Sequence, residues 1–71
     1  MDRVTFGREV STLRKERGMT QADLHRTSGL APSHISMLER GRRSVTVATL
    51  AKLAHGLDLP VAALVELAST G

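Results

Sequence analysis

The sequence predicts an all-α fold, a compact domain of five short helices. Apolar residues recur three or four positions apart, which is the spacing of one helix face. Glycine and proline stand between these runs, where helices end and begin. No alternation of apolar and polar residues competes as a β-strand. Because 71 residues provide only one modest core, we expect a single domain over 1–71, packed between 6 and 68.

The first two helices are marked by an apolar face and by end signals. Phe6, Val10 and Leu13 share one face of the first helix. This helix should end at Gly18, because glycine readily adopts the left-handed conformation that closes helices. Thr20 then begins the second helix as its N-cap, and Asp23 stands three residues on, as in a capping box.

The third helix follows the second after a tight turn at Ser28-Gly29-Leu30. Pro32 suits the first turn of a helix, where its missing amide hydrogen has no partner to lose. We therefore expect this helix to begin near Ala31 or Pro32 and to end before Gly41.

Two more helices complete the prediction. Hydroxyl groups between Ser44 and Thr46 cap the fourth helix, which continues to Gly56. Its inward positions keep the helical period: Val47, Leu50, Ala54 and Leu57. Pro60 opens a fifth helix that runs to about Ala68.

Positive charge is concentrated in the first part of the chain. All ten Lys and Arg residues lie at or before Lys52, and only Asp58 and Glu66 are charged after it. A basic face attracts phosphates, although a solvated surface that serves solubility gives the same pattern. No stretch has the roughly 20 apolar residues needed to cross a bilayer, and no signal peptide precedes the first helix. Together with the absence of cysteine, this leads us to expect a cytoplasmic protein.

The segment from Gln21 to Arg40 has the skeleton of a helix-turn-helix, two short helices joined by a turn centred on glycine. This motif places its second helix in the major groove of DNA. The apolar anchors fall where two steeply crossing helices need them: Leu24, Leu30, Ile35 and Leu38.

The chain closely resembles the lambda-repressor and Cro-like family of bacterial regulators, also called the xenobiotic-response-element type. The resemblance covers about Phe6 to Ala68 and rests on three stretches: RKERGMTQADL, SGL and HISMLERGRRSVTVATLAKLA. Within the family, the chain is most similar to controller proteins of restriction-modification systems, which share SGL, ERGRR and a fifth helix used for dimerisation. The resemblance implies a five-helix, lambda-repressor-like DNA-binding domain.

The resemblance also implies a set of DNA-binding residues. Gln21 would hydrogen-bond a phosphate from the start of the second helix, although it also suits a surface helix position. The recognition helix would expose Pro32, Ser33, His34, Ser36 and Met37, with base contacts chiefly at Pro32, Ser33 and Met37. Pro32 stands where relatives often carry Arg or Gln to read base edges, so we expect apolar contacts and DNA shape to contribute. His34 would either donate to a phosphate or be an ordinary solvated histidine.

Three arginines and one ion pair complete the predicted site. Arg40, Arg42 and Arg43 follow the recognition helix, where guanidinium groups can fork onto phosphates, although solvated loop arginines are the alternative. Arg14 and Glu39 match family positions that form an ion pair between the first and third helices. The resemblance therefore implies a structural role for both.

The histidines raise two further questions. His25 departs from the family, which usually has alanine where the second and third helices approach closely. Either the helices separate slightly, or the imidazole ring moves to the edge of the contact. His25, His34 and His55 do not follow a zinc-ligand spacing, and there is no cysteine, so we expect no metal and no cofactor.

The fifth helix is more apolar than one buried face requires. Seven of its residues are apolar: Val61, Ala62, Ala63, Leu64, Val65, Leu67 and Ala68. We expect a second copy of the chain to contact Val61, Leu64, Val65, Leu67 and Ala68. A symmetric dimer would set two recognition helices about 34 Å apart on a palindromic site. The alternative is that these residues only fill the core of one copy.

Together these patterns predict a sequence-specific transcriptional regulator that binds palindromic double-stranded DNA as a homodimer. We expect it at the nucleoid of the bacterial cytoplasm, with no membrane or small-molecule partner. One alternative is an antitoxin-type protein that also binds a toxin, and a more distant one is a protein-interaction module that does not contact DNA. We do not expect an enzyme, because no nucleophile, base and orienting group stand at a plausible spacing.

Overall fold

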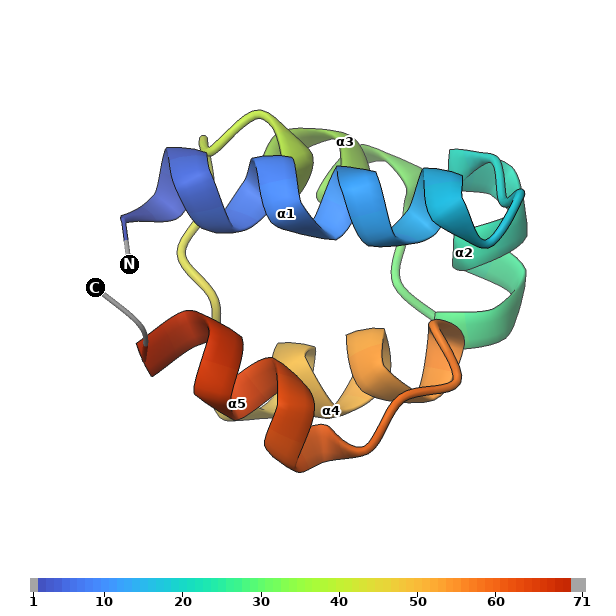
Figure 1. The fold of residues 1–71 in the computed structure, drawn as a ribbon. Helices are drawn as coiled ribbons and strands as arrows, with labels where there is room; N and C mark the ends of the chain where they lie inside the picture. Colours follow the sequence, from blue (N-terminus) through green and yellow to red (C-terminus); the bar gives the residue numbers. More distant parts are fainter. Residues whose placement is uncertain (1, 70–71) are drawn as a thin grey trace.

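The computed structural model describes residues 2–69, and this part of the chain forms five helices without a strand (Figure 1). The helices are α1 (Arg3–Glu16), α2 (Gln21–Ser28), α3 (Pro32–Glu39), α4 (Val47–Gly56) and α5 (Val61–Ser69). The predicted all-α fold is therefore confirmed, and α2 and α3 begin where the sequence placed them.

The helices form two groups that face each other (Figure 1). In that view α1, α2 and α3 make the upper group, and α4 and α5 make the lower group. Within and between the groups, α1 packs on α3, α2 packs on both α3 and α4, and α4 packs on α5. The start of α1 and the end of α5 lie at the same end of the molecule.

A single apolar core fills the space between the two groups. Its buried members are Phe6, Val10, Leu24, Leu30, Ile35, Leu38, Leu50, Leu53, Ala54, Leu57 and Leu64. The inward positions predicted for the first four helices are therefore buried or partly buried, with one exception. Val47 is 78% exposed, so the prediction that it faces the core is wrong. It is the first residue of α4, directly after the N-cap Thr46.

Short-range hydrogen bonds define where helices begin. Asp23 N–H donates to Thr20 Oγ1 over 3.0 Å, and Thr20 N–H donates to Asp23 Oδ2 over 2.8 Å, which confirms the capping box. The backbone hydrogen bond from Thr20 holds the pKa of the Asp23 carboxyl below its ordinary value. At α4, Thr49 N–H donates to Thr46 Oγ1 over 3.1 Å. These side chains satisfy amides that have no partner within their own helices.

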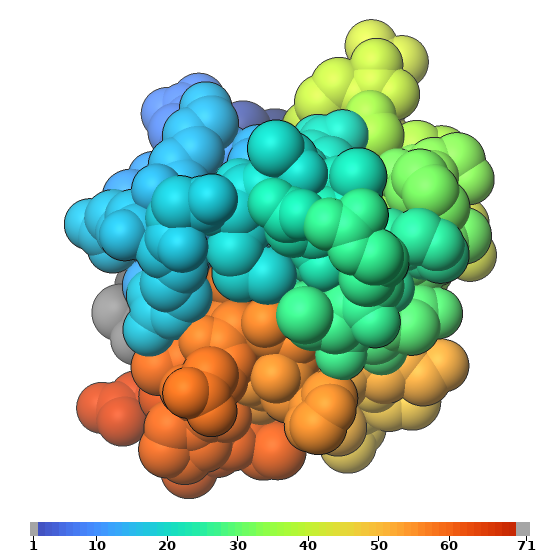
Figure 2. Space-filling view, turned by 90° about the vertical axis from the view of Figure 1, so that its right-hand side faces the viewer, coloured from blue at the N-terminus to red at the C-terminus, as the bar shows by residue number. Residues whose placement is uncertain are grey.

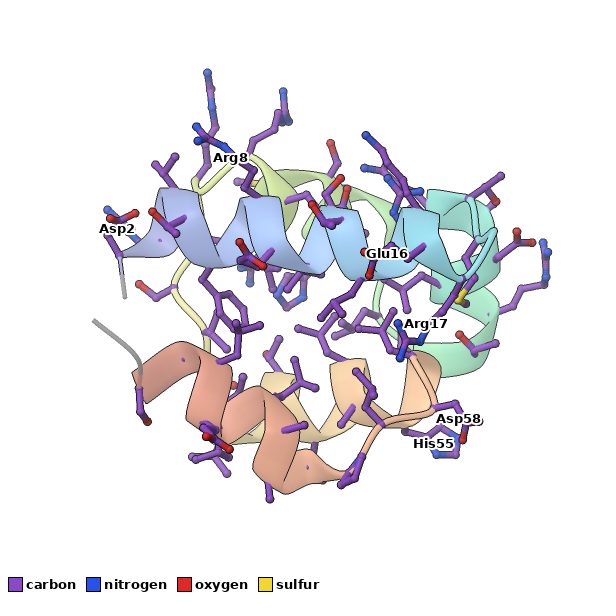
Figure 3. The ribbon with its side chains drawn as sticks, viewed as in Figure 1. Asp2, Arg8, Glu16, Arg17, His55 and Asp58 are labelled. Carbon is purple, nitrogen blue, oxygen red and sulfur yellow. The ribbon has the colours of Figure 1, made fainter. Side chains whose placement is uncertain are left out.

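Two contacts fix α1 against the rest of the molecule. At Gly7, a Cβ atom would lie only 2.2 Å from the Leu38 carbonyl oxygen, so α1 and the end of α3 approach with backbone against backbone. At the other end of α1, Arg17 Nε donates to the Leu57 carbonyl oxygen over 2.7 Å. Figure 3 shows Arg17 reaching down towards the connection between α4 and α5, near His55 and Asp58. The first helix thus braces both α3 and α4.

Within residues 2–69, no helix has the length and apolar character needed to span a membrane. In the same described part, no group of three or more His, Asp or Glu side chains is placed to hold a metal ion. The polar and basic groups of this part of the chain that bear on function lie on and around α2 and α3.

Candidate nucleic-acid interface

The α2–α3 connection is a tight elbow built around Gly29. This residue has a φ of 79°, in the left-handed region, and its N–H donates to the His25 carbonyl oxygen over 2.9 Å. Leu30 N–H donates to the buried Ser28 Oγ over 3.1 Å. The turn therefore satisfies its own backbone groups, and it sets the angle between the two helices.

His25 lies at the edge of this elbow. Its side chain is exposed, and its Nδ1 atom is 2.7 Å from the Leu30 carbonyl oxygen. Because a carbonyl oxygen only accepts, Nδ1 is the protonated nitrogen in this contact. The sequence left open whether the helices separate or the ring moves to the edge of their contact. The ring lies at the edge, where it adds a hydrogen bond across the turn.

The start of α3 is the most exposed part of the recognition helix. Pro32 is its first residue, Ala31 provides no side-chain cap, and both Pro32 and Ser33 are exposed. Ser36 and Met37 are half-buried one turn later, while Ile35 and Leu38 face the core. The amides and side chains at the start of α3 are thus open to a ligand.

His34 does not lie with this exposed set. It is half-buried, and its Nε2 atom is covered and has no hydrogen-bond partner among the described residues. Burial lowers the pKa of His34, and the positive charges of Arg43 and Lys52 lower it further. The protein therefore covers one ring nitrogen of His34, which an ordinary solvated histidine would expose.

Three exposed arginines surround the C-terminal end of α3. The chain reverses there through Gly41, whose N–H donates to the Leu38 carbonyl oxygen, and Arg42 N–H donates to Met37. Arg40, Arg42 and Arg43 are all exposed, and Arg40 Nε donates to the Ser36 carbonyl oxygen over 3.3 Å. In Figure 2 the yellow-green segment near residue 40 projects from the surface beside α2 and α3. Guanidinium groups therefore flank the exposed side of α3.

Arg14 and Glu39 form the ion pair that the resemblance implied. Arg14 Nε donates to Glu39 Oε2 over 2.7 Å, and Arg14 Nη2 donates to Glu39 Oε1 over 3.1 Å. The side chains are only 9% and 6% exposed. A third donor, Arg14 Nη1, reaches the Met19 carbonyl oxygen over 2.7 Å. The hydrogen bonds that Arg14 donates to the Glu39 carboxylate raise the pKa of Arg14, which keeps the guanidinium charged despite its burial.

Gln21 belongs to the same cluster, which the sequence did not reveal. Its Nε2 atom donates to Glu39 Oε1 over 3.0 Å, so the first residue of α2 is tied to the last residue of α3. Eighteen positions separate the two residues. No spacing rule for a single helix connects them, and only the crossing of the two helices brings them together.

A family model described as helix-turn-helix matches residues 10–64, a span that includes α2, α3 and α4. The chain belongs to the helix-turn-helix family. The elbow at Gly29 and the exposed start of α3 are therefore the parts of a helix-turn-helix, and the predicted class of DNA-binding transcriptional regulators, rather than enzymes, is confirmed.

Several regulators share much of this helix-turn-helix sequence. The HTH-type transcriptional regulator y4dJ of Sinorhizobium fredii is 42% identical over 57 residues, covering 80% of this chain and 74% of that protein. The immunity repressor of Bacillus phage phi105 is 34% identical over 62 residues, and the repressor RghR of Bacillus subtilis is 40% identical over 57 residues. The chain covers 43% and 42% of these two repressors, less than half of each.

Solved structures support the same grouping. The restriction-modification controller protein C.AhdI from Aeromonas hydrophila has a TM-score of 0.80 at 38% identity, covering 86% of this chain and 92% of that one. The controller protein C.Esp1396I, solved as a tetramer in complex with its natural 35 base-pair operator, has a TM-score of 0.80 at 31% identity, covering 90% of this chain and 84% of that one. The resemblance to controller proteins is thus confirmed at the level of the fold.

The helix-turn-helix protein departs from prediction in its fifth helix. Leu64 is 1% exposed and belongs to the core, so its assignment to an interface between copies is wrong. Leu67 and Ala68 are partly buried against the same core. Val61 and Val65, in contrast, are 44% and 42% exposed. The apolar excess of α5 is therefore divided, because one side fills the core while the other side faces outwards.

Proposed function

We propose that this chain is a single helix-turn-helix domain that regulates transcription by placing α3 in the major groove of duplex DNA. The observation that carries the proposal is the arrangement of charge around the elbow. Pro32 and Ser33 are exposed at the start of α3, and three exposed arginines stand at its other end. With exposed residues at one end of α3 and arginines at the other, the start of the helix can contact bases while the arginines contact the phosphates beside the groove.

The proposal assigns different roles to the predicted residues. Arg40, Arg42 and Arg43 bind phosphates, together with Gln21 at the start of α2. Ser33 contacts base edges, while Pro32 and Met37 contact thymine methyl groups, with Ser36 beside them. His34 supports α3 from the protein side rather than contacting DNA.

Fluorescence anisotropy with duplex DNA over a range of salt concentrations tests this division. Arg43→Ala should weaken binding to all sequences and should reduce the salt slope by about 0.9, the value for one neutralised phosphate. Ser33→Ala should leave the salt slope unchanged and alter the bases selected from a random duplex library. If instead Arg43→Ala altered base selection and Ser33→Ala reduced the salt slope, the proposed placement of α3 in the groove would be wrong.

The proposal includes a homodimer on a palindromic site in the cytoplasm, at the nucleoid. The exposed valines of α5, Val61 and Val65, support it, because two copies can cover them together. The structure of C.Esp1396I as a tetramer on its operator supports it by analogy. Sedimentation of the wild type and of Val65→Asp measures the association. A wild type that stays monomeric well above the concentrations at which it binds DNA would contradict the dimer.

An antitoxin-type function makes a different prediction, since such a protein also holds a toxin. Purification from the native host would then yield a second protein in stoichiometric amount. A regulator that acts alone purifies without one, so this experiment separates the two functions.

A further inference from the structure

Glu39 connects three elements of the molecule through one carboxylate. Its Oε2 atom accepts from Arg14 Nε, and its Oε1 atom accepts both from Arg14 Nη2 over 3.1 Å and from Gln21 Nε2 over 3.0 Å. Glu39 is nearly buried, with 6% of its side chain exposed, whereas Gln21 is partly exposed. The carboxylate therefore holds a side chain that itself reaches the surface at the start of α2.

The contact decides which end of the Gln21 amide faces inwards. An ionised carboxylate only accepts hydrogen bonds, so the NH₂ group, and not the carbonyl oxygen, must face Glu39. One N–H of Nε2 is used in this bond. The amide group is planar, so this bond also fixes the direction of the other N–H on the same nitrogen.

Arg14 makes this arrangement compatible with an anionic ligand. An unpaired carboxylate beside the start of α2 would repel a phosphate. The two hydrogen bonds from the guanidinium neutralise Glu39, and a third N–H, on Arg14 Nη1, donates to the Met19 carbonyl oxygen. The cluster thus presents a donor to the surface without presenting its negative charge.

We propose that Glu39 is a positioning residue for DNA binding: it orients the Gln21 amide so that its second N–H donates to a phosphate oxygen of the DNA backbone. This proposal rests on the proposed function and deepens it, because it identifies Glu39 as the group that orients Gln21 towards the phosphate. Glu39 itself does not contact DNA.

The experiment measures binding to duplexes in which single phosphates are replaced, one at a time, by uncharged methylphosphonates. For the wild type, the replacement nearest Gln21 should weaken binding by about tenfold, the size of one hydrogen bond to a charged group. Gln21→Ala should bind normal DNA more weakly by a similar factor. Its binding should no longer change when that one phosphate is replaced by a methylphosphonate.

Glu39→Gln separates positioning from charge. The new amide can either donate to Gln21 or accept from it, so the orientation of Gln21 is no longer imposed, while an oxygen remains for Arg14. For this variant, a methylphosphonate at the same phosphate should weaken binding by only about twofold or less, and replacements at other phosphates should have the same effects as in the wild type. Leu59→Ala is the matched control, because Leu59 packs on the core away from this cluster and its truncation lowers stability alone. It should keep the wild-type profile.

A second measurement uses the wild type and avoids the risk of an unfolded variant. In NMR spectra of the free protein, one proton of the Gln21 side-chain amide should be protected from exchange by Glu39, and the other should exchange freely. Addition of normal duplex should shift the free proton, and the duplex with the methylphosphonate at that phosphate should not.

The outcomes separate this inference from the proposed function. If the wild type does not bind duplex DNA, the proposed function fails. If the wild type binds DNA but Glu39→Gln keeps the full loss at the Gln21 phosphate, the positioning role fails alone. Equal, rapid exchange of both amide protons in the free wild type would also overturn it.

Discussion

The upper group of helices, α1 to α3, and the lower group, α4 and α5, are held by different kinds of contact. In the upper group, Arg14, Glu39 and Gln21 share hydrogen bonds of 2.7–3.1 Å that join all three helices. In the lower group, the contacts between α4 and α5 are mainly those of buried leucines, and α5 has only one charged residue, Glu66.

The difference follows from what each group has to do. Hydrogen bonds and ion pairs are directional, so they fix the orientation of one helix relative to another. Apolar burial is roughly proportional to area and carries no direction. Under the proposed function, orientation matters most where α3 enters the DNA groove, whereas α4 and α5 contribute stability and, in the proposed dimer, the surface for a second copy.

The largest effect is expected from Arg14→Ala. It leaves Glu39 nearly buried without its charged partner, which should lower the free energy of unfolding by about 3–5 kcal/mol. Arg8→Ala, at an exposed position of the same helix, should cost less than about 0.5 kcal/mol. Urea denaturation measures both. Equal costs for the two variants would show that the ion pair does not stabilise the upper group.

Glycine-to-alanine changes compare a close contact within the upper group with one between the two groups. At Gly7 the added Cβ would meet backbone, 2.2 Å from the Leu38 carbonyl oxygen, whereas at Gly56 it would meet Ser28 Cβ at 2.7 Å and Leu24 Cδ1 at 2.8 Å. Leu24 Cδ1 is the end of a flexible side chain, whereas Ser28 Cβ is bonded to the backbone, so Gly56 has partial room to adjust and Gly7 has none. We expect Gly7→Ala to cost about 3 kcal/mol and Gly56→Ala about 2 kcal/mol in stability. Thermal unfolding monitored by circular dichroism provides the ranking, and a larger cost at Gly56 would reverse the comparison.

Helix caps provide a smaller test. Thr20→Ala removes a reciprocal capping box at the start of α2, while Thr46→Ala removes the bond to Thr49 N–H at the start of α4. Each should cost about 1 kcal/mol, with Thr20→Ala the more costly because Asp23 also loses the hydroxyl that holds its position. The same denaturation experiment applies, with Thr12→Ala on the exposed side of α1 as a threonine control. A negligible effect at both caps would mean that packing alone sets these helix ends.

The smallest effect is expected from pH, at His34, whose surroundings come from both groups. Burial and the charges of Arg43 and Lys52 lower its pKa in the folded state, so the unfolded chain takes up its proton first as the pH falls. Stability is therefore complete above the ordinary histidine pKa of about 6.5 and declines as the pH falls towards the lowered value. His34→Gln should remove this part of the decline below about pH 6.5. Identical pH profiles of the melting temperature would show that His34 does not contribute.

The sequence by itself determined the features that depend on neighbouring residues. Thr20 and Asp23 predicted the start of α2, Gly29 predicted the turn, and Pro32 predicted the start of α3, because caps and turns act over only a few positions. The period of apolar residues also identified most of the core. The exposed arginines after α3 could be found from their place in the chain.

Only the tertiary structure decided which side chains meet across helices. The bond between Gln21 and Glu39, the inward turn of His34 and the burial of Leu64 all depend on how helices cross, and helical periodicity does not specify the partner of a given face. Val47 likewise keeps the period of α4, yet it is 78% exposed. Local signals set the helices of this protein, and long-range packing set which of their groups remain available to DNA.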